Sequence, residues 1–384
     1  MNYMFFFDFP QNQKLSVSRE FYLDLLGKST DQGKNIALLG STKTGKTSIV
    51  RSFIESNKDV AAVYIDLNRI STPPENFSIE FAGNAAFWFV GISKNYKKFL
   101  DIDYLLGLKE LGKAISFIEK IKNESEKIKP NQRLMIESAF SFVEELGKKS
   151  NKKLVLFLDN FENILDMNNY SQIKDVLSII DFSSRNVSYV VTSSETGLMK
   201  NKLKGFAFEE IKSFDKQETA SLVEKILGKS DKKVIDDVFR YSNGNPYLIE
   251  KICFRYKEVK DVKKAFFTEL VLKDSPIYNY CQKSISDSLN RARGKALLKT
   301  ILKVLSSVKS AKLTEISKKI YRSAPVTKSV LERLILVDLV AREDNQYSFS
   351  NNVLKDWFRL NMLGFGFKEI NDEILKLVEE ELNE

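Results

Sequence analysis

The chain contains no histidine and only two cysteines, Cys253 and Cys281. Without histidine, Ser-His and Cys-His nucleophilic catalysis and histidine-ligated metal sites are excluded. The two cysteines lie far apart without ligand spacing, which argues against structural zinc and against a disulfide framework, and favours a reducing compartment. Any chemistry must therefore depend on carboxylates, lysine, arginine, hydroxyl groups and a metal held by oxygen ligands.

Long apolar runs are also missing. No run approaches the roughly 18 residues that cross a bilayer, and the N-terminal cluster Met4–Phe7, interrupted by Asp8 and Pro10, is too short for a signal peptide. We therefore expect a cytoplasmic protein that makes no membrane contact. The length of 384 residues allows two or three domains. The formal net charge of +9 suggests an anionic partner.

The most informative stretch runs from Gly40 to Thr47 and matches the phosphate-binding pattern G-x-x-x-x-G-K-T. An apolar run at 35–39 precedes it, and residues 48–54 have helical spacing. A glycine-rich turn between a strand and a helix directs backbone N–H groups at a phosphate. We therefore predict that ATP or ADP binds with Mg²⁺ at the loop residues Gly40, Ser41, Thr42, Lys43, Thr44, Gly45, Lys46, Thr47 and Ser48.

Each residue type in this loop has a physical role. Gly40 and Gly45 let the backbone turn and approach the phosphates. Lys46 would place a positive charge on the β and γ phosphates, and the Thr47 hydroxyl would be a hard oxygen ligand for Mg²⁺. The alternative is a chance match in a loop rich in Gly, Ser and Thr, which the flanking strand and helix patterns disfavour.

Further apolar runs alternate with helical segments and predict more parallel strands, at residues 60–66, 154–159 and 187–192, with residues 206–211 as a candidate for a fifth strand. The second of these ends in Asp159, as a Walker B strand does, so Asp159 is predicted to join Thr47 at the Mg²⁺. The third ends in Thr192, whose hydroxyl could hydrogen-bond the γ phosphate or its water. These residues would complete a catalytic set with Lys46.

Position 160 holds an asparagine where many P-loop ATPases have a glutamate that orients the attacking water. Asn160 can hold a water by hydrogen bonding but cannot take its proton. Phosphoryl transfer is largely dissociative, so losing a base is less harmful than losing the metal or the phosphate cradle. Slow hydrolysis is therefore expected. Glu162 is either a substitute carboxylate or a solvent-facing residue at the start of a helix.

The remainder of the chain is mostly helical. Residues 215–227 and 247–254 predict helices, and the turn at 242–248 places Pro246 at a helix start, where its missing N–H costs little. Three amphipathic helices follow between residues 296 and 336, and residues 337–349 have the composition of a two-stranded wing. The predicted organisation is an ATPase core, a helical lid and linker, a winged helix and an acidic helical tail, at 1–212, 213–290, 291–368 and 369–384.

The predicted winged helix is strongly basic. Between Arg291 and Arg333 there are 12 Lys or Arg residues and two Glu residues, a composition that can mark a nucleic-acid surface. The helix that begins near Thr327 would enter the major groove of duplex DNA, and the predicted contacts are Lys318, Lys319, Arg322, Lys328 and Arg333. An equally good explanation is a lysine-rich surface that contacts the core or a protein partner. The oligomeric state stays open.

The motifs occur in the order seen in the archaeal ATPase family, which is related to the STAND signal-transduction ATPases and the Orc1/Cdc6 initiators. The chain resembles this family over nearly its whole length, through Phe6-Phe7-Asp8, Pro10, Ser18-Arg19-Glu20 and residues 40–47, 74–77, 158–162, 192–199 and 244–248. The resemblance implies an α/β P-loop NTPase core with an AAA+-like parallel sheet and flanking helices, a helical lid and a C-terminal winged helix. It also implies that Arg19 lies near the adenine and that Pro246 belongs to a lid motif that contacts the nucleotide.

The sequence departs from this family at two places. Asn160 replaces the usual acid, and residues 205–207 lack an arginine that members often carry. Both departures argue against rapid turnover. The leading hypothesis is a slowly hydrolysing, Mg²⁺-dependent ATP switch whose nucleotide state sets the angle between the core and the winged helix. The alternatives are a DNA-binding regulator with a structural ATP site and a protein-interaction scaffold with neither activity.

Overall fold

A five-stranded parallel sheet forms the centre of the first lobe in the computed structural model, which describes residues 19–91, 95–150, 152–292 and 294–383. The sheet consists of β1 (Ile36–Leu39), β2 (Ala61–Asp66), β3 (Leu154–Asp159), β4 (Val187–Ser193) and β5 (Ala207–Glu210). Every residue of β1, β3 and β4 is buried, as expected for strands covered on both faces. The predicted α/β fold with a parallel sheet is confirmed.

The strand order, β2-β3-β4-β1-β5, decides which residues meet. Because the strands are parallel, the residues that follow them gather at one edge of the sheet. The register places Asp66 level with Asp159 on the neighbouring strand, and Leu39 level with Ser193. The loop after β1 therefore lies beside the ends of β4 and β3.

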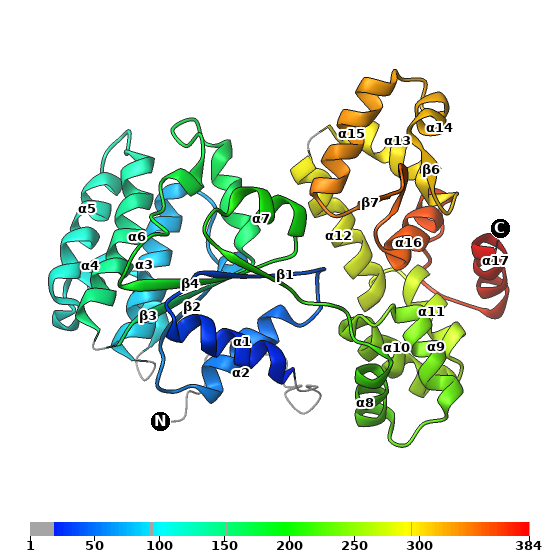
Figure 1. The fold of residues 1–384 in the computed structure, drawn as a ribbon, viewed down its shortest axis with the longest axis horizontal. Coiled ribbons are helices and arrows are strands. Elements are labelled where there is room, and N and C mark those ends of the chain that lie inside the picture. The colour runs from blue at the N-terminus through cyan, green and yellow to red at the C-terminus, as the bar shows by residue number, and fades with distance from the viewer. Residues whose placement is uncertain (1–18, 92–94, 151, 293, 384) are drawn as a thin grey trace.

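Helices surround this sheet (Figure 1). They are α1 (Glu20–Asp31), α2 (Lys46–Ser56), α3 (Pro74–Val90), α4 (Ile102–Leu106), α5 (Ile115–Ser125), α6 (Gln132–Lys149) and α7 (Thr196–Lys202). α1 packs against α2, whereas α3 contacts both α6 and the edge strand β2. One hydrophobic cluster joins these elements from Leu26 to Ile211, and it holds the carboxyl edge of the sheet in place.

The second lobe lies beside the first (Figure 1) and is mainly helical. Its helices are α8 (Lys216–Leu227), α9 (Lys232–Ser242), α10 (Pro246–Val259), α11 (Val262–Val271), α12 (Pro276–Ala292), α13 (Lys295–Ser306), α14 (Leu313–Lys319), α15 (Ala324–Leu336), α16 (Asn352–Met362) and α17 (Asp372–Asn383). A small antiparallel sheet in the order β6-β8-β7 is formed by β6 (Ala311–Lys312), β7 (Val340–Glu343) and β8 (Gln346–Phe349). A second hydrophobic cluster, from Phe214 to Val378, runs through the whole lobe.

The motif residues Phe6–Asp8, Pro10 and Ser18 lie outside the described residues. Within the described ranges, none of the helices is both long enough and apolar enough to cross a membrane. The lid and the C-terminal unit share one hydrophobic cluster, and the domain boundaries within the second lobe stay predictions.

A glycine in the turn between α9 and α10 allows a prediction about stability. Gly244 has φ of 69°, and a Cβ there would lie 2.1 Å from the carbonyl oxygen of Phe214. Gly228 has φ of 81° but open space around it. The ψ of −167° at Gly228 lies in a region that is essentially restricted to glycine, so Gly228→Ala should cost about 1–3 kcal/mol from backbone strain alone. Gly244→Ala should cost a further ~1–3 kcal/mol because the backbone must also move apart.

The measurement is the free energy of unfolding from denaturant titration of the two variants and the wild type. Equal losses for both variants would contradict the close packing of this turn against Phe214.

Candidate nucleotide site

The loop from Gly40 to Thr47 connects β1 to α2 at the carboxyl edge of the sheet. A Cβ on Gly40 would lie 2.5 Å from the carbonyl oxygen of Ile211, so only glycine fits without a shift of the backbone. Gly45 has φ of 100° and directly precedes α2. The first N–H groups of a helix lack intrahelical partners and carry the positive end of its dipole. The loop therefore has the geometry of an anion-binding loop, and nucleotide binding at residues 40–48 stays a prediction.

Lys46 lies over this loop. Its Nζ donates hydrogen bonds to the carbonyl oxygens of Gly40 at 2.7 Å and Ser41 at 2.8 Å. Burial lowers the pKa of Lys46 to about 8, an effect that the carboxylates of Glu162 and Asp159 partly oppose. A phosphate at the loop would add a negative charge beside the ammonium group and favour its protonated form.

Asp159 accepts three side-chain hydrogen bonds although it is only 2% exposed. Its Oδ2 accepts from the hydroxyls of Thr47 and Tyr64, each at 2.8 Å. Its Oδ1 accepts from the hydroxyl of Thr192. The structure thus brings Thr47 and Asp159 together, and both offer the hard oxygen atoms that Mg²⁺ prefers.

No group of three or more Cys, Asp or Glu residues that could hold a metal is found in the described parts of the chain. A Mg²⁺ ion at Thr47 and Asp159 would therefore take its other oxygen ligands from the nucleotide and from water, which is usual for this ion. The donor set fits Mg²⁺ shared with a phosphate.

Thr192 supports Asp159 from the neighbouring strand. Besides donating to Asp159, its Oγ1 accepts from the backbone N–H of Asn160 at 3.1 Å. The hydroxyl proton is thus directed at Asp159, whereas the sequence suggested a contact with the γ phosphate. Tyr64 was not anticipated, because in the sequence it is one more apolar residue of a strand. Burial raises its pKa, so its hydroxyl stays a donor.

Asn160 follows Asp159 in a left-handed conformation with φ of 57°. Its Nδ2 donates to Oδ1 of Asp66 at 2.8 Å. Asp66 ends β2, and burial raises its pKa. The sequence showed that the run at 60–66 ends in an acid, but only the pairing of β2 with β3 brings this acid to Asn160.

Glu162 is buried, with 4% of its surface exposed, so the solvent-facing alternative is wrong. Its Oε1 accepts from the backbone N–H of Ser194 at 3.2 Å and from the Ser194 hydroxyl at 2.6 Å. Its Oε2 is buried without a hydrogen-bond partner in the described structure. The Glu162 carboxylate is also near enough to Lys46 to raise the pKa of that lysine.

Arg19 and the lid contact the phosphate loop from another direction. Arg19 donates to the carbonyl oxygens of Thr44 at 3.4 Å and Lys212 at 2.8 Å, and its guanidinium carbon lies 4.5 Å from the centre of the Phe214 ring. Asn245, which caps α10 directly before Pro246, donates from Nδ2 to the carbonyl oxygen of Thr42 at 3.1 Å. Both predicted nucleotide contacts, Arg19 and Pro246, are thus in elements that meet the loop.

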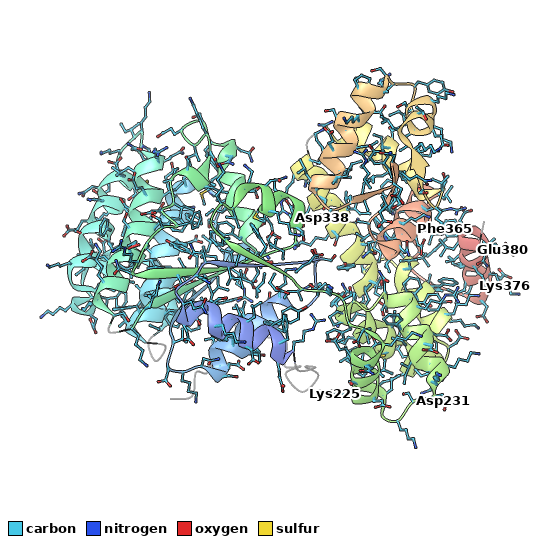
Figure 2. All side chains as sticks on the ribbon, viewed as in Figure 1. Lys225, Asp231, Asp338, Phe365, Lys376 and Glu380 are labelled. Atoms are coloured by element: carbon cyan, nitrogen blue, oxygen red, sulfur yellow. The ribbon has the colours of Figure 1, made fainter. Side chains whose placement is uncertain are left out.

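The second lobe reaches this site through residues that the sequence did not single out. Arg291 of α12 donates to the carboxylate of Glu195 and, at 2.7 Å, to Oδ1 of Asn163. Asp338, which Figure 2 labels on the side of the second lobe that faces the first, accepts from the backbone N–H of Thr196 at 2.5 Å. Burial raises the pKa of Glu195 to about 7 and that of Asp338 to about 6. These contacts begin two residues after Ser193, where β4 ends.

The predicted DNA contacts do not form one group. Four of the five, Lys318, Lys319, Arg322 and Lys328, have exposed side chains in or beside the turn between α14 and α15. Tyr321, in the same turn, is 88% exposed. Arg333 instead lies half-buried, and its Nη1 donates to the carbonyl oxygen of Ala292 at 3.4 Å. Arg333 therefore belongs to the packing of α15 on the end of α12.

Three solved structures illustrate what the chain is similar to, and the first of them shares its fold. A Walker-type ATPase of Pyrococcus abyssi has a TM-score of 0.61 and 17% sequence identity, with 89% of this chain and 95% of that chain covered. The Aeropyrum pernix ORC1 protein in complex with DNA has a TM-score of 0.41 and 12% identity, with 90% and 92% covered. A STAND protein with a tetratricopeptide repeat sensor from Pyrococcus horikoshii has a TM-score of 0.37 and 15% identity, with 96% and 45% covered. No curated protein sequence is significantly similar to the chain.

The sequence itself identifies the family. Residues 17–252 match the model of a family described as an ATPase domain predominantly from Archaea. The matched range contains the phosphate loop, Asp159, the end of β4 and the lid turn with Pro246. The chain therefore belongs to this archaeal ATPase family, as the resemblance of its motifs predicted.

Proposed function

We propose that this protein is an ATP-binding, slowly ATP-hydrolysing and Mg²⁺-dependent switch that transmits its nucleotide state to the C-terminal lobe. The observation that carries the proposal is the contact of that lobe with Glu195 and Thr196, directly beyond the strand that supports Asp159. Loss of the γ phosphate can then affect the second lobe through β4 and the residues that directly follow it.

The residues of the site have distinct roles in this proposal. The loop N–H groups and Lys46 hold the phosphates, and Thr47 and Asp159 hold Mg²⁺, which neutralises charge on the β and γ oxygen atoms when bound. Thr192 and Tyr64 keep the Asp159 carboxylate in place. Arg19 and Asn245 of the lid donate hydrogen bonds to backbone carbonyl groups of the loop and hold it in place.

The coupling begins at Glu162. This carboxylate is buried near Lys46 and has one oxygen without a partner, so a γ phosphate at the loop would repel it or draw it into a new hydrogen bond with water. Its other oxygen is bonded to Ser194, which directly precedes Glu195. Glu195 pairs with Arg291 of the second lobe. Displacement of Glu162 would therefore weaken this ion pair or change the orientation of the second lobe relative to the first.

The first test concerns nucleotide binding. Lys46→Ala removes a charged donor and should weaken ATP binding by roughly tenfold to a hundredfold, the loss expected for hydrogen bonds to a charged group. Thr47→Ala should weaken binding only when Mg²⁺ is present, because this hydroxyl serves the metal. Calorimetry with ATP and ADP, with and without Mg²⁺, measures both. Wild-type protein that binds neither nucleotide would contradict the proposal.

The second test concerns the coupling. Arg291→Ala removes the ion pair with Glu195 and should weaken the ATP-dependent change in the distance between the lobes, because the second lobe loses one contact beyond β4 while Asp338 still accepts the N–H of Thr196. The measurement is resonance energy transfer between one dye on each lobe, with ADP and with ATP. Arg240→Ala, an exposed arginine on α9, is the control. An ATP response equal to that of the wild type would show that the lobes communicate by another route.

We further propose that α13, β6, α14, α15, β7 and β8 form a winged helix that binds duplex DNA. The order helix-strand-helix-helix-strand-strand supports the winged helix. The exposed cations at the turn between α14 and α15 support an interaction with phosphates. A protein-binding unit is the alternative, which the exposed Tyr321 and Val326 would also suit.

The combined variant Lys318→Ala, Lys319→Ala and Arg322→Ala tests the DNA surface. Each lost phosphate contact lowers the slope of log affinity against log salt by about 0.9, so the combined variant should lose up to about 2.7. Arg333→Ala is a control, because Arg333 faces Ala292, and should leave the slope unchanged. Fluorescence anisotropy of labelled duplex over a range of salt concentrations measures this. Wild-type protein that binds no duplex at low salt would favour the protein-binding alternative.

A further inference from the structure

One face of helix α10 carries aromatic rings that alternate with lysines. The residues along it are Tyr247, Lys251, Phe254 and Lys257, at the spacing that places side chains on one side of a helix. The Nζ of Lys251 lies 5.2 Å from the centre of the Tyr247 ring and 5.5 Å from that of Phe254. The Nζ of Lys257 lies 5.4 Å from the centre of the Phe254 ring. The two rings and the two ammonium groups therefore adjoin one another along the helix.

The Phe254 ring is open to solvent, whereas the Tyr247 ring is held in place. Phe254 is 38% exposed, and Lys257 beside it is exposed. The Tyr247 hydroxyl donates to the carbonyl oxygen of Pro276 at 3.2 Å, and its ring centre lies 5.7 Å from that of Tyr280. A single exposed phenylalanine is ordinary. An accessible ring between two ammonium groups combines the stacking surface and the positive charge that single-strand binding uses.

Two further lysines extend this face beyond α10. Lys43 of the phosphate loop is exposed, and its Nζ lies 5.4 Å from the centre of the Tyr247 ring. Lys283 is exposed on α12. Burial lowers the pKa of Lys43, and the positive charges of Lys283 and Lys251 lower it further. Three ammonium groups from three elements therefore lie near one another, and an anion among them would relieve their repulsion.

The acidic residues of α10 do not neutralise this face. Glu250 pairs with Lys251 at 2.7 Å, and Glu258 pairs with Arg255 at 2.6 Å. In the parts of the chain that the structure describes, no ion pair is found for three of the lysines, namely Lys43, Lys257 and Lys283. We call the whole set the α10 surface, which consists of Lys43, Tyr247, Lys251, Phe254, Lys257 and Lys283.

We propose that the α10 surface binds single-stranded nucleic acid, with one base stacked on Phe254 and the neighbouring phosphates on the lysines. A base can stack on a side-chain ring only when it is free of its own duplex stack, so the exposed ring favours a single strand. An acidic protein segment would meet the lysines but would leave the ring without a stacking partner. Because the surface is separate from the turn between α14 and α15, the inference goes beyond the duplex binding proposed above.

Substitution of the ring tests the stacking. Phe254→Leu keeps an apolar side chain on α10 but removes the aromatic face, and it should weaken binding of a labelled oligothymidylate by roughly fivefold to a hundredfold, as for the loss of one stacked base. Phe254→Trp keeps an aromatic face and should bind at least as tightly as the wild type. Fluorescence anisotropy at low salt with Mg²⁺ and ADP measures both variants of the full chain, and their melting temperatures show whether the fold is kept. Oligouridylate in parallel distinguishes DNA from RNA.

Substitution of the lysines tests the phosphate contacts. Each phosphate contact on a single strand contributes about 0.7 to the slope of log affinity against log salt. The combined variant Lys251→Ala, Lys257→Ala and Lys283→Ala should therefore lower this slope by up to about 2.1. The control removes the same charge from three exposed lysines around the turn between α8 and α9, as Lys229→Ala, Lys232→Ala and Lys233→Ala, and should leave the slope close to that of the wild type.

The outcomes separate this surface from the other candidates. Wild-type protein that binds neither oligonucleotide at low salt overturns the inference, as does binding that Phe254→Leu leaves unchanged. A loss that follows the lysines but not the ring would favour an acidic protein partner instead. The combined variant at Lys318, Lys319 and Arg322 should bind oligothymidylate as the wild type does. Loss of single-strand binding in that variant would place the strand on the proposed winged helix and overturn the assignment to α10.

Discussion

The buried carboxylate of Asp159 is the interaction on which the site depends. Removing a carboxylate from water is costly unless hydrogen bonds replace those it loses. Thr47, Tyr64 and Thr192 supply these bonds from α2, β2 and β4. The parallel sheet brings these three elements to one edge. Asp159 therefore connects the phosphate loop and the predicted metal site to β4, the strand that leads to the contacts with the second lobe.

The junction of the lobes extends this arrangement. Glu195 is 2% exposed and is paired with Arg291, and Asp338 accepts the backbone N–H of Thr196. Burial raises the pKa of both acids toward neutrality, which indicates that their charges are only partly compensated. A junction with partly compensated buried charges is sensitive to a new charge nearby, and the γ phosphate would bring one. This sensitivity is the physical reason for the switch that we propose.

Local patterns predicted the strands and the phosphate loop well, because both signals are contained in a few consecutive residues. The run that ends in Asp159 became a buried strand with the predicted bounds, and Thr47 lies against Asp159 as expected. Tyr64, Asp66 and Arg291 could not be recognised in this way, since their roles arise from strand register and from lobe packing. Glu162 shows the same limit, because the sequence could not tell a buried carboxylate from an exposed one. Arg333 was grouped with the exposed cations by composition, although packing turns it toward Ala292.

The most direct test of the central claim is hydrogen exchange of the wild-type protein with ADP and with a non-hydrolysable ATP analogue, both with Mg²⁺. The account predicts that the analogue changes exchange at residues 194–198 and also at 288–292 and 335–340, because these segments meet at the end of β4. A difference confined to the phosphate loop and α2, with the junction unchanged, would contradict the account: the protein would then bind nucleotide without transmitting its state to the second lobe.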